Sequence, residues 1–302
     1  MKNLDIKKLS FEFKDNLKIN HDIKKKNWFN IGGKAKLFFK AENLNELKNF
    51  IIRIENKKKI FVLGAGSNTL FTDGIFDGVV IKLSKNFNNI SKLSEEIIIA
   101  GSAVTDKALS DYAMENNLSG FEFLSCIPGT VGGGIKMNAG CYGSEFKDIL
   151  LSVQAINKNG QIITIPSNKI KFEYRNNNLS NDLIFLSASF KGKKNNKIDI
   201  KSLMKKYKDQ KEISQPTKIK TSGSTFKNPI AQTDKKVWEL IKQSVPLNTN
   251  FGDAKISDKH CNFFINKGNA SFKDMKNLIE FVSNKVLENT GITIETEIKI
   301  IE

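Results

Sequence analysis

Residues 126–143 read CIPGTVGGGIKMNAGCYG, and this stretch holds six of the chain's 20 glycines. Glycine suits main chain that turns sharply or comes close to a ligand, and glycines this dense weaken an ordinary helix or strand. A flexible spacer would be padded with serine and charge. Here the glycines alternate with side chains that can be anchored in a core: Ile127, Val131, Ile135, Met137 and Tyr142. We therefore favour a cradle that holds a ligand over a flexible spacer.

The composition is that of an ordinary globular protein. With 302 residues, of which 39% are hydrophobic, the chain is long enough for two domains with separate cores. It has no apolar run long enough to span a membrane, and its N-terminus alternates charge with single hydrophobic residues, unlike a signal peptide. We expect a cytoplasmic protein without membrane contact.

Cysteine and histidine usage argues against disulfides and metal sites. Cys126, Cys141 and Cys261 show no CxxC spacing and, being three, cannot all pair. This fits a reducing compartment. The only histidines are His21 and His260, so we expect no histidine metal chemistry and no bound metal.

The net charge of +16 raises the question of nucleic-acid binding. Nearly all of the positive charge is lysine spread along the chain, with no aromatic-interleaved motif of the RNA-binding kind. A lysine bias explains the charge more simply, so we expect no nucleic-acid partner. Arg53 and Arg175 are the only arginines. A chain that otherwise uses lysine keeps arginine where a planar, bidentate fork is needed, which makes Arg175 a candidate site residue.

The hydrophobic periodicity predicts an α+β fold with mixed sheets. We expect a domain over residues 1–192 and a second over residues 193–302, because a lysine-rich segment begins near residue 192. Helices are expected over residues 43–58, 105–116, 234–243 and 273–289. Thr105 is the expected cap of the second helix, and the last has a capping box from Ser271 to Asp274 and an end at Gly291. Strands are expected over residues 60–63, 79–83, 97–100 and 292–301, and a hairpin over 149–165 turning at Asn159-Gly160.

Two glycine-rich loops are candidates for phosphate binding. GAGSNT at residues 64–69 follows a predicted strand, but Thr69 stands where a dinucleotide-binding loop has a third small residue, and Asp-Gly turns at 73–74 and 77–78 follow instead of a helix. Residues 126–143 lack the Lys-Ser/Thr ending of a P-loop. Backbone N–H groups in two such loops can still form nests for a pyrophosphate. Two plain hairpin turns remain the alternative.

Six ordered motifs carry a resemblance to a known family. The chain resembles the UDP-N-acetylenolpyruvoylglucosamine reductases from residue 27 to its C-terminus. Their joint order is far more specific than any one motif. The motifs are GAGSN at 64–68, IPGTVGGGIKMNAGCYG at 127–143, YRNN at 174–177, SGSTFKNP at 222–229, KISDKHCNFFIN at 255–266 and IETEI at 294–298.

The resemblance implies a fold, a reaction and two cofactors. It implies an FAD-binding domain of the vanillyl-alcohol-oxidase-like (PCMH) type in residues 1–192, and a smaller α+β substrate-binding domain in 193–302. In this family NADPH reduces a bound FAD, which reduces the enolpyruvyl ether of a UDP-sugar during peptidoglycan synthesis. We expect non-covalent FAD and a monomer. The implied FAD contacts are Gly64, Ala65, Gly66, Ser67, Asn68, Gly101, Pro128, Gly129, Thr130, Gly132, Gly133, Asn138, Ala139 and Gly140.

The resemblance also assigns the chemistry. Arg175 matches the family's catalytic arginine, whose fork can hold the substrate carboxylate while charge develops. Ser224 matches the proton-donating serine, and Asn228 in the same motif is expected to bind substrate. Bare pattern would make Arg175 a surface residue and Ser224 a turn serine. His260 is interpreted as structural.

Glu297 is the third implied catalytic residue. Ile292, Ile294, Ile298 and Ile300 alternate with polar residues, so the pattern alone indicates a strand whose other face is solvated. The family instead uses that face in the active site, with a Glu-Pro-Glu-Val motif whose second glutamate matches Glu297. This chain has Thr296 in place of the proline, which leaves the local geometry open.

The chain differs from some members of the family in one respect, and two other functions are alternatives to this hypothesis. The short stretch from Arg175 to Ser224 resembles the family's shorter type, without an inserted loop that brings a tyrosine to the substrate pyrophosphate. Tyr207 lies there in a lysine-rich helical pattern. The groups that hold the pyrophosphate stay open, with Lys211, Lys218 and Lys220 as candidates. The rivals are another flavin oxidoreductase on the same scaffold and a non-catalytic nucleotide- or RNA-binding protein.

Overall fold

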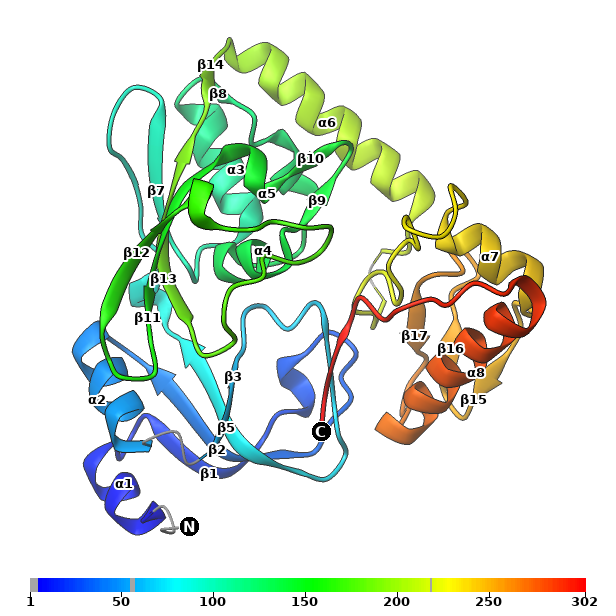
Figure 1. The fold of residues 1–302 in the computed structure, drawn as a ribbon, viewed down its shortest axis with the longest axis horizontal. Coiled ribbons are helices and arrows are strands. Elements are labelled where there is room, and N and C mark those ends of the chain that lie inside the picture. Colours follow the sequence, from blue (N-terminus) through cyan, green and yellow to red (C-terminus); the bar gives the residue numbers. More distant parts are fainter. Residues whose placement is uncertain (1–4, 55–57, 218) are drawn as a thin grey trace. The chain divides into compact units, whose positions relative to one another are not determined.

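The computed structural model describes residues 5–54, 58–217 and 219–302, in which helices and strands are mixed (Figure 1). The chain forms two units. The first unit comprises Met1–Ile19, Lys36–Ala65 and Asp77–Gln210, and the second comprises Asn20–Ala35, Gly66–Phe76 and Lys211–Glu302. Residues 193–210 thus group with the first unit, and two short early segments group with the second. The expected domain division after residue 192 stays a prediction.

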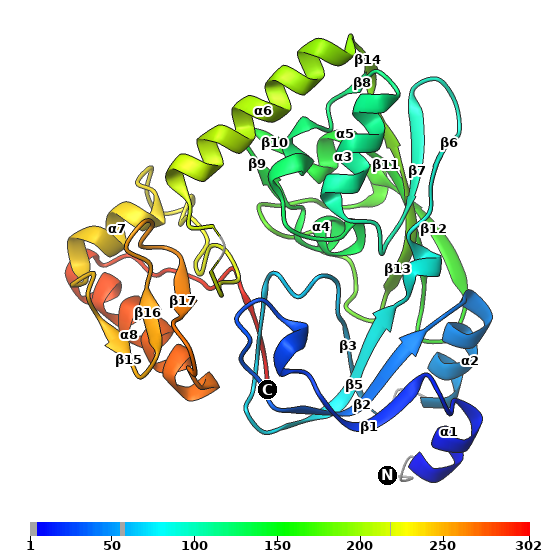
Figure 2. The same cartoon turned by 180° about the vertical axis from the view of Figure 1, so that it is seen from behind.

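The first unit contains a five-stranded antiparallel sheet in the order β12-β11-β13-β7-β6. Its strands are β6 (Ile90–Lys92), β7 (Ile97–Gly101), β11 (Leu150–Ile156), β12 (Ile162–Pro166) and β13 (Ile184–Lys191). The helices α3 (Asp106–Glu115) and α4 (Val131–Met137) pack with this sheet in one hydrophobic core (Figure 2). The hairpin of β11 and β12 was predicted, and Gly160 in its turn has a left-handed φ of 74°.

The first unit also contains smaller elements. They are the helix α5 (Phe146–Ile149) and the paired strands β8 (Leu118–Ser119) with β14 (Lys193–Lys194) and β9 (Gly140–Cys141) with β10 (Ser144–Glu145). The predicted cap of α3 is confirmed, because the Thr105 side chain accepts a hydrogen bond from the N–H of Ala108 at 3.1 Å. The lysine-rich segment forms the long helix α6 (Lys197–Ser214), as its pattern indicated.

A four-stranded sheet, in the order β1-β2-β5-β3, accompanies two N-terminal helices. Its strands are β1 (Leu17–Asp22), β2 (Lys34–Ala41), β5 (Ile75–Leu83) and β3 (Lys59–Val62), and the helices are α1 (Ile6–Glu12) and α2 (Leu44–Ile54). The stacked rings of Phe39 and Phe50, 3.8 Å apart, form part of its core. The predicted Asp-Gly turn at 77–78 is wrong, because both residues lie inside β5, whose pairing with β3 includes Gly78.

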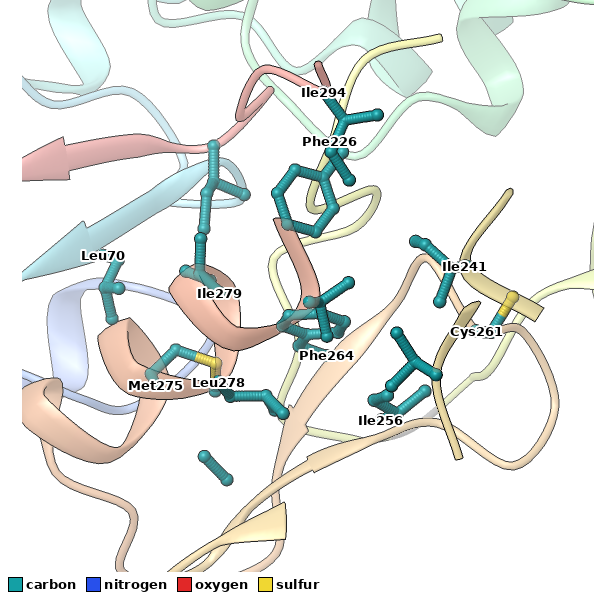
Figure 3. Packing of buried hydrophobic residues seen from close by; sticks show 14 of the residues in the cluster. Leu70, Phe226, Ile241, Ile256, Cys261, Phe264, Met275, Leu278, Ile279 and Ile294 are labelled. Carbon is teal, nitrogen blue, oxygen red and sulfur yellow. The ribbon is translucent and has the colours of Figure 1, made fainter. Parts of the chain in front are cut away.

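The second unit has its own core. The sheet β15 (Asn250–Phe251), β16 (Ala254–Ile256), β17 (Phe264–Asn266) packs with α7 (Val237–Ser244) and α8 (Phe272–Thr290). Figure 3 shows Phe226 and Phe264 among these buried side chains. Their ring centroids are 5.8 Å apart in an edge-on geometry. The predicted capping box of Ser271 and Asp274 is confirmed, and α8 ends at Gly291 in the left-handed conformation.

The final strand is shorter than its alternating pattern predicted. Only β18 (Lys299–Ile301) is a strand, and it pairs in parallel with β4 (Thr69–Phe71). Upstream, Thr296 forms one isolated bridge with Phe226. Ile294 and Ile298 are buried as the pattern indicated. Their alternation therefore reflects packing into the core of the second unit, not membership of a continuous ladder.

Candidate active site

The glycine-rich stretch is more regular than its composition suggested. Residues 131–137 form the helix α4, although glycines this dense disfavour a helix. Close packing explains the difference: a Cβ on Gly134 would overlap the Phe146 ring, and one on Gly132 would lie 3.0 Å from the Cβ of Ser102. A Cβ on Gly133 would meet only Thr130 Oγ1, at 3.6 Å. The helix therefore packs closely on one side, and Gly133 offers bare backbone on another.

Asn138 ends this helix in the left-handed conformation, with φ of 41°. Its side chain is fully buried. Nδ2 donates to Glu145 Oε2 at 3.0 Å and to the carbonyl of Glu173 at 3.1 Å, and Oδ1 accepts from the N–H of Lys147. These bonds fix the turn after α4. They give Asn138 a structural function, and its contact with FAD stays a prediction.

The first glycine loop follows β3, as predicted. In the first unit, a Cβ on Gly64 would lie 2.6 Å from Thr130 Oγ1, so this loop and the start of α4 are neighbours. The Lys82 ammonium donates to the Gly64 carbonyl. In the second unit, Gly66 has φ of 72° and its carbonyl accepts from the N–H of Trp28 at 3.0 Å. Glycine is required at 66 because a Cβ there would overlap the Lys26 carbonyl.

Buried polar groups lie behind the glycine-rich stretch. Asp106 is fully buried at the start of α3, and a Cβ on Gly129 would lie 2.5 Å from its Oδ2. Among the described residues, both Asp106 oxygens and Ser102 Oγ are buried without a hydrogen-bond partner. Burial raises the pKa of the Asp106 carboxyl well above its usual value. Gly101 is equally confined, since a Cβ there would overlap the Phe87 carbonyl.

Arg175 has an unusual backbone conformation. Its φ of 58° lies in the left-handed region, which costs a non-glycine residue about 1–3 kcal/mol and is concentrated at functional sites. The guanidinium Nη2 donates to the Gly140 carbonyl at 3.0 Å, and the guanidinium Cζ lies 4.9 Å from the centroid of the Tyr174 ring. The catalytic arginine implied by the sequence is therefore held at the end of the glycine-rich stretch.

The segments that carry Ser224 and Glu297 come together in the second unit. Ser224 forms an isolated antiparallel β-bridge with Phe263. The carbonyl of the next residue, Thr225, accepts a hydrogen bond from the N–H of Glu297 at 2.8 Å. On the other side of the Thr296 bridge, the N–H of Lys227 donates to the Glu295 carbonyl at 2.9 Å. Neither of these two bonds uses the Thr296 N–H, so this pairing is as compatible with threonine as with the family's proline.

Two asparagines near Ser224 and Glu297 are fixed by backbone groups. Asn228 Oδ1 accepts from the N–H of Val237 at 3.0 Å, at the start of α7. Asn68 Nδ2 donates to the Glu297 carbonyl at 3.1 Å, and its own carbonyl accepts from the N–H of Lys299. The first glycine loop thus contacts the Glu297 segment within the second unit. The binding functions implied for Asn68 and Asn228 stay predictions.

Other candidates are placed as follows. His260 Nδ1 accepts from the N–H of Asn262 at 3.2 Å, and burial lowers the pKa of its imidazole, in keeping with a structural histidine. Tyr207 stacks on Tyr142 with ring centroids 4.5 Å apart. Lys220 donates to the Gly268 carbonyl at 3.1 Å, and Lys218 lies outside the described residues. Across the described part of the chain, no three His, Cys, Asp or Glu side chains are grouped to hold a metal.

Known proteins match this chain along almost its whole length. A UDP-N-acetylenolpyruvoylglucosamine reductase of Pelagibacter ubique is 61% identical over 298 residues, covering 99% of this chain and 99% of that protein. The chain belongs to the UDP-N-acetylenolpyruvoylglucosamine reductase family. A reductase of the same name from Rickettsia typhi is 44% identical over 286 residues, covering 95% of this chain and 96% of the relative.

Domain profiles and a solved structure agree with this membership. The FAD binding domain profile matches residues 35–166, and that of the UDP-N-acetylenolpyruvoylglucosamine reductase C-terminal domain matches residues 215–301. A crystal structure of UDP-N-acetylenolpyruvylglucosamine reductase from Thermus caldophilus superimposes with a TM-score of 0.80 at 28% identity, covering 95% of this chain and 100% of that one. The expected α+β fold with an FAD-binding domain is confirmed. Within the described residues, no helix is both long and apolar enough to cross a bilayer.

Family membership makes the chain an FAD-dependent reductase of peptidoglycan precursor synthesis that uses NADPH. The residues present fit FAD. A Cβ on Gly64 or Gly129 would overlap a neighbouring side chain, and one on Gly132 would be tightly packed at 3.0 Å, whereas one on Gly133 would meet only Thr130 Oγ1 at 3.6 Å. Backbone N–H groups in such glycine loops suit a diphosphate. When bound, FAD supplies the hydride that reaches the substrate.

Sequence reasoning missed one residue in this arrangement. Asn262 is buried, and its side chain and carbonyl bond to the two residues that follow Ser224. Its motif, KHCNFFIN, contributed to the resemblance. A buried polar residue in a recognised motif was the available signal, but the partner lies 36 positions away.

Proposed function

We propose that this chain converts the enolpyruvyl ether of its UDP-sugar to the lactyl ether, with Ser224 as proton donor, Arg175 as carboxylate ligand and Glu297 as assistant in charge handling. We further propose that it acts in the cytoplasm as a monomer, without nucleic acid. The observation that carries the residue assignment is the hydrogen bond of 2.8 Å from the Glu297 N–H to the Thr225 carbonyl, which joins the segments of two of the three residues.

The reaction itself requires these three functions. Addition of hydride to the methylene carbon builds negative charge on the carbon beside the carboxylate, and this charge must be stabilised and then removed by a proton. A guanidinium fork can take both carboxylate oxygens while the charge spreads into them. Arg175 supports that function because its donor to Gly140 and its backbone conformation define the position of the fork.

Ser224 supplies the proton in this proposal. A serine hydroxyl is a weak acid, so the alkoxide it leaves must be stabilised by its surroundings. The segment after Ser224 is held on two sides, by Asn262 and by Glu297, which fixes the backbone next to the residue that carries the hydroxyl. Lys227 lies in the same segment, where its ammonium pairs with Glu295 at 3.1 Å.

The absorption spectrum of the pure protein tests the proposal. The preparation should show flavin bands, lose them when NADPH is added, and regain them when the enolpyruvyl UDP-sugar follows without oxygen. Recovery with oxygen but not with the sugar would favour a different flavin oxidoreductase. A protein without flavin bands, even after incubation with FAD, would favour the nucleotide-binding alternative.

Acid precipitation of the same preparation tests how the FAD is attached. We expect all of the flavin in the supernatant, because His21 and His260 lie outside the glycine loops. Cys126 and Cys141 flank the stretch that we assign to FAD. Flavin that stays in the pellet would show a covalent link and would point to one of these thiols.

A further inference from the structure

Asn262 holds the segment that follows Ser224 through both ends of its amide. Oδ1 accepts from the N–H of Phe226 at 3.0 Å, and Nδ2 donates to the carbonyl of the same residue at 2.9 Å. The Asn262 carbonyl also accepts from the N–H of Thr225 at 2.7 Å. The side chain is only 4% exposed, so water competes little for these bonds.

The held segment is also tied to its neighbours. The Thr225 hydroxyl accepts from the N–H of Phe264 at 3.3 Å, and the Thr225 carbonyl accepts from the N–H of Glu297. The Phe226 ring is buried against Phe264 in the core of the second unit (Figure 3). The backbone that begins at Ser224 is therefore fixed by a buried ring and by hydrogen bonds on both sides.

The two hydrogen bonds between the Asn262 side chain and the Phe226 backbone explain why an amide stands at position 262. The Phe226 backbone offers one N–H and one C=O, which need an acceptor and a donor in one planar group. An ionised aspartate offers only acceptors, and leucine has a similar volume with neither. Loss of the amide would leave both buried backbone groups without their partner, so the segment would shift to satisfy them.

We propose that Asn262 is a positioning residue that sets the Ser224 hydroxyl relative to Glu297 for protonation of the substrate carbon. This inference rests on the proposed function of Ser224. Asn262 acts through the backbone of residues 225 and 226 and needs no contact with substrate. A displacement of about 1 Å at a reacting group can cost on the order of a hundredfold in rate. The effect should therefore fall on proton transfer and on kcat more than on KM.

Asn262→Leu and Asn262→Asp test the proposal in the full-length holoenzyme. Enzyme reduced with NADPH is mixed rapidly with the enolpyruvyl UDP-sugar, and the return of the flavin absorption is followed. We expect Asn262→Leu to slow this return roughly tenfold to a hundredfold, and to enlarge its solvent deuterium isotope effect. Reduction by NADPH should stay within about twofold of the original rate. Asn262→Asp keeps the acceptor, so its rate of flavin return should lie between those of the original protein and Asn262→Leu. This variant carries the test by itself if the leucine variant does not fold.

Asn266→Leu is the matched control. Asn266 is also 4% exposed and lies in the second unit, and its side chain bonds to Phe29, Gly268 and Ala270. It therefore reproduces the loss of a buried amide at a site without bonds to residues 225 and 226. We expect Asn266→Leu to lower the melting temperature about as much as Asn262→Leu, yet leave flavin return and its isotope effect unchanged.

The outcomes separate this inference from the function on which it rests. If Ser224→Ala slows flavin return but Asn262→Leu and Asn262→Asp do not, Asn262 has no positioning function. Equal slowing by Asn266→Leu and Asn262→Leu would also overturn the inference, because loss of stability alone would explain it. If Ser224→Ala returns its flavin absorption at the original rate, the proposed function of Ser224 fails, and this inference fails with it.

Discussion

Two regions of this reductase solve the same problem of holding irregular main chain in different ways. Around Ser224, polar side chains satisfy the backbone, with Asn262 bonded to both backbone groups of Phe226. Around α4, close packing holds the main chain, because Gly132 and Gly134 let the helix approach its neighbours. The buried side-chain oxygens of Asp106 and Ser102 have no hydrogen-bond partner among the described residues. We conclude that changes near Ser224 should alter rates, whereas changes near α4 should alter stability and FAD affinity.

The largest expected effect is kinetic and belongs to the first region. Ser224→Ala should slow the return of flavin absorption with the UDP-sugar by roughly two to four decades, the usual contribution of a general acid. Reduction by NADPH should be unaffected because it needs no proton at the substrate carbon. Stopped-flow absorption at the flavin band separates the two steps. Equal slowing of both steps would mean that Ser224 only shapes the pocket.

A pair of glycine changes sharpens the comparison in the second region. Gly134→Ala places a Cβ against the Phe146 ring and should destabilise the apoprotein by about 1–3 kcal/mol. Gly133→Ala meets only Thr130 Oγ1 at 3.6 Å and should gain about 0.5–1 kcal/mol from helix propensity. Urea unfolding of both apoproteins measures these changes.

FAD titration of the same two variants completes the test. Gly133→Ala should weaken FAD binding despite its stable fold, because Gly133 offers the uncovered backbone. If Gly133→Ala binds FAD as tightly as the original protein, the flavin does not approach the main chain at this position. Similar loss of stability in both variants would contradict the packing described for α4.

The last expected effect is a pH dependence of stability that belongs to Asp106. Its pKa is raised in the folded state, so the folded chain keeps a proton that the unfolded chain releases above pH of about 4. Stability from this group is therefore fully present in acid and is lost as pH rises to the folded pKa, by up to about 1.4 kcal/mol per pH unit. Asp106→Asn should remove this slope from the unfolding free energy of the apoprotein.

Asp111→Asn is the control for that measurement. Asp111 lies on the same helix, is more exposed, and pairs with Lys107 at 2.7 Å. The same chemical change there should leave the slope intact. A slope that persists in Asp106→Asn would show that other groups produce it and that Asp106 does not.

Most local signals were read correctly from the sequence, and tertiary ones were not. The local exception is Asp77-Gly78, which lies inside β5 instead of forming a turn. The ends of α8 follow from Ser271, Asp274 and Gly291, whose effects act within one turn. The helix at residues 131–137 could not be predicted, because its glycines favour other conformations until Phe146 and Ser102 pack against them. The alternating isoleucines before β18 indicated a strand. Among the described residues this segment instead forms one isolated β-bridge, between Thr296 and Phe226, which the pattern alone could not reveal.

The features of the candidate site also divide into those that the sequence indicated and those that it did not. Motif order indicated Arg175, Ser224 and Glu297 as candidates, since each sits in a recognisable string of residues. The hydrogen bonds of Asn262 could not be predicted, because they are made to a backbone 36 positions away. The interleaving of the two units was also hidden, because residues 20–35 and 66–76 differ little in composition from the segments around them.

The pairing of β4 with β18 has a consequence for biosynthesis. Residues 69–71 are made early, but their sheet partner is residues 299–301. At ordinary translation rates of 5–20 residues per second, β4 waits roughly 10 to 50 s for that partner to leave the ribosome. Throughout that time an apolar strand, with Leu70 and Phe71 that are fully buried in the finished protein, is open to chaperones and to other nascent chains. The second unit is therefore completed only after residues 299–301 have been synthesised, and nascent chains are most exposed to misassembly before then.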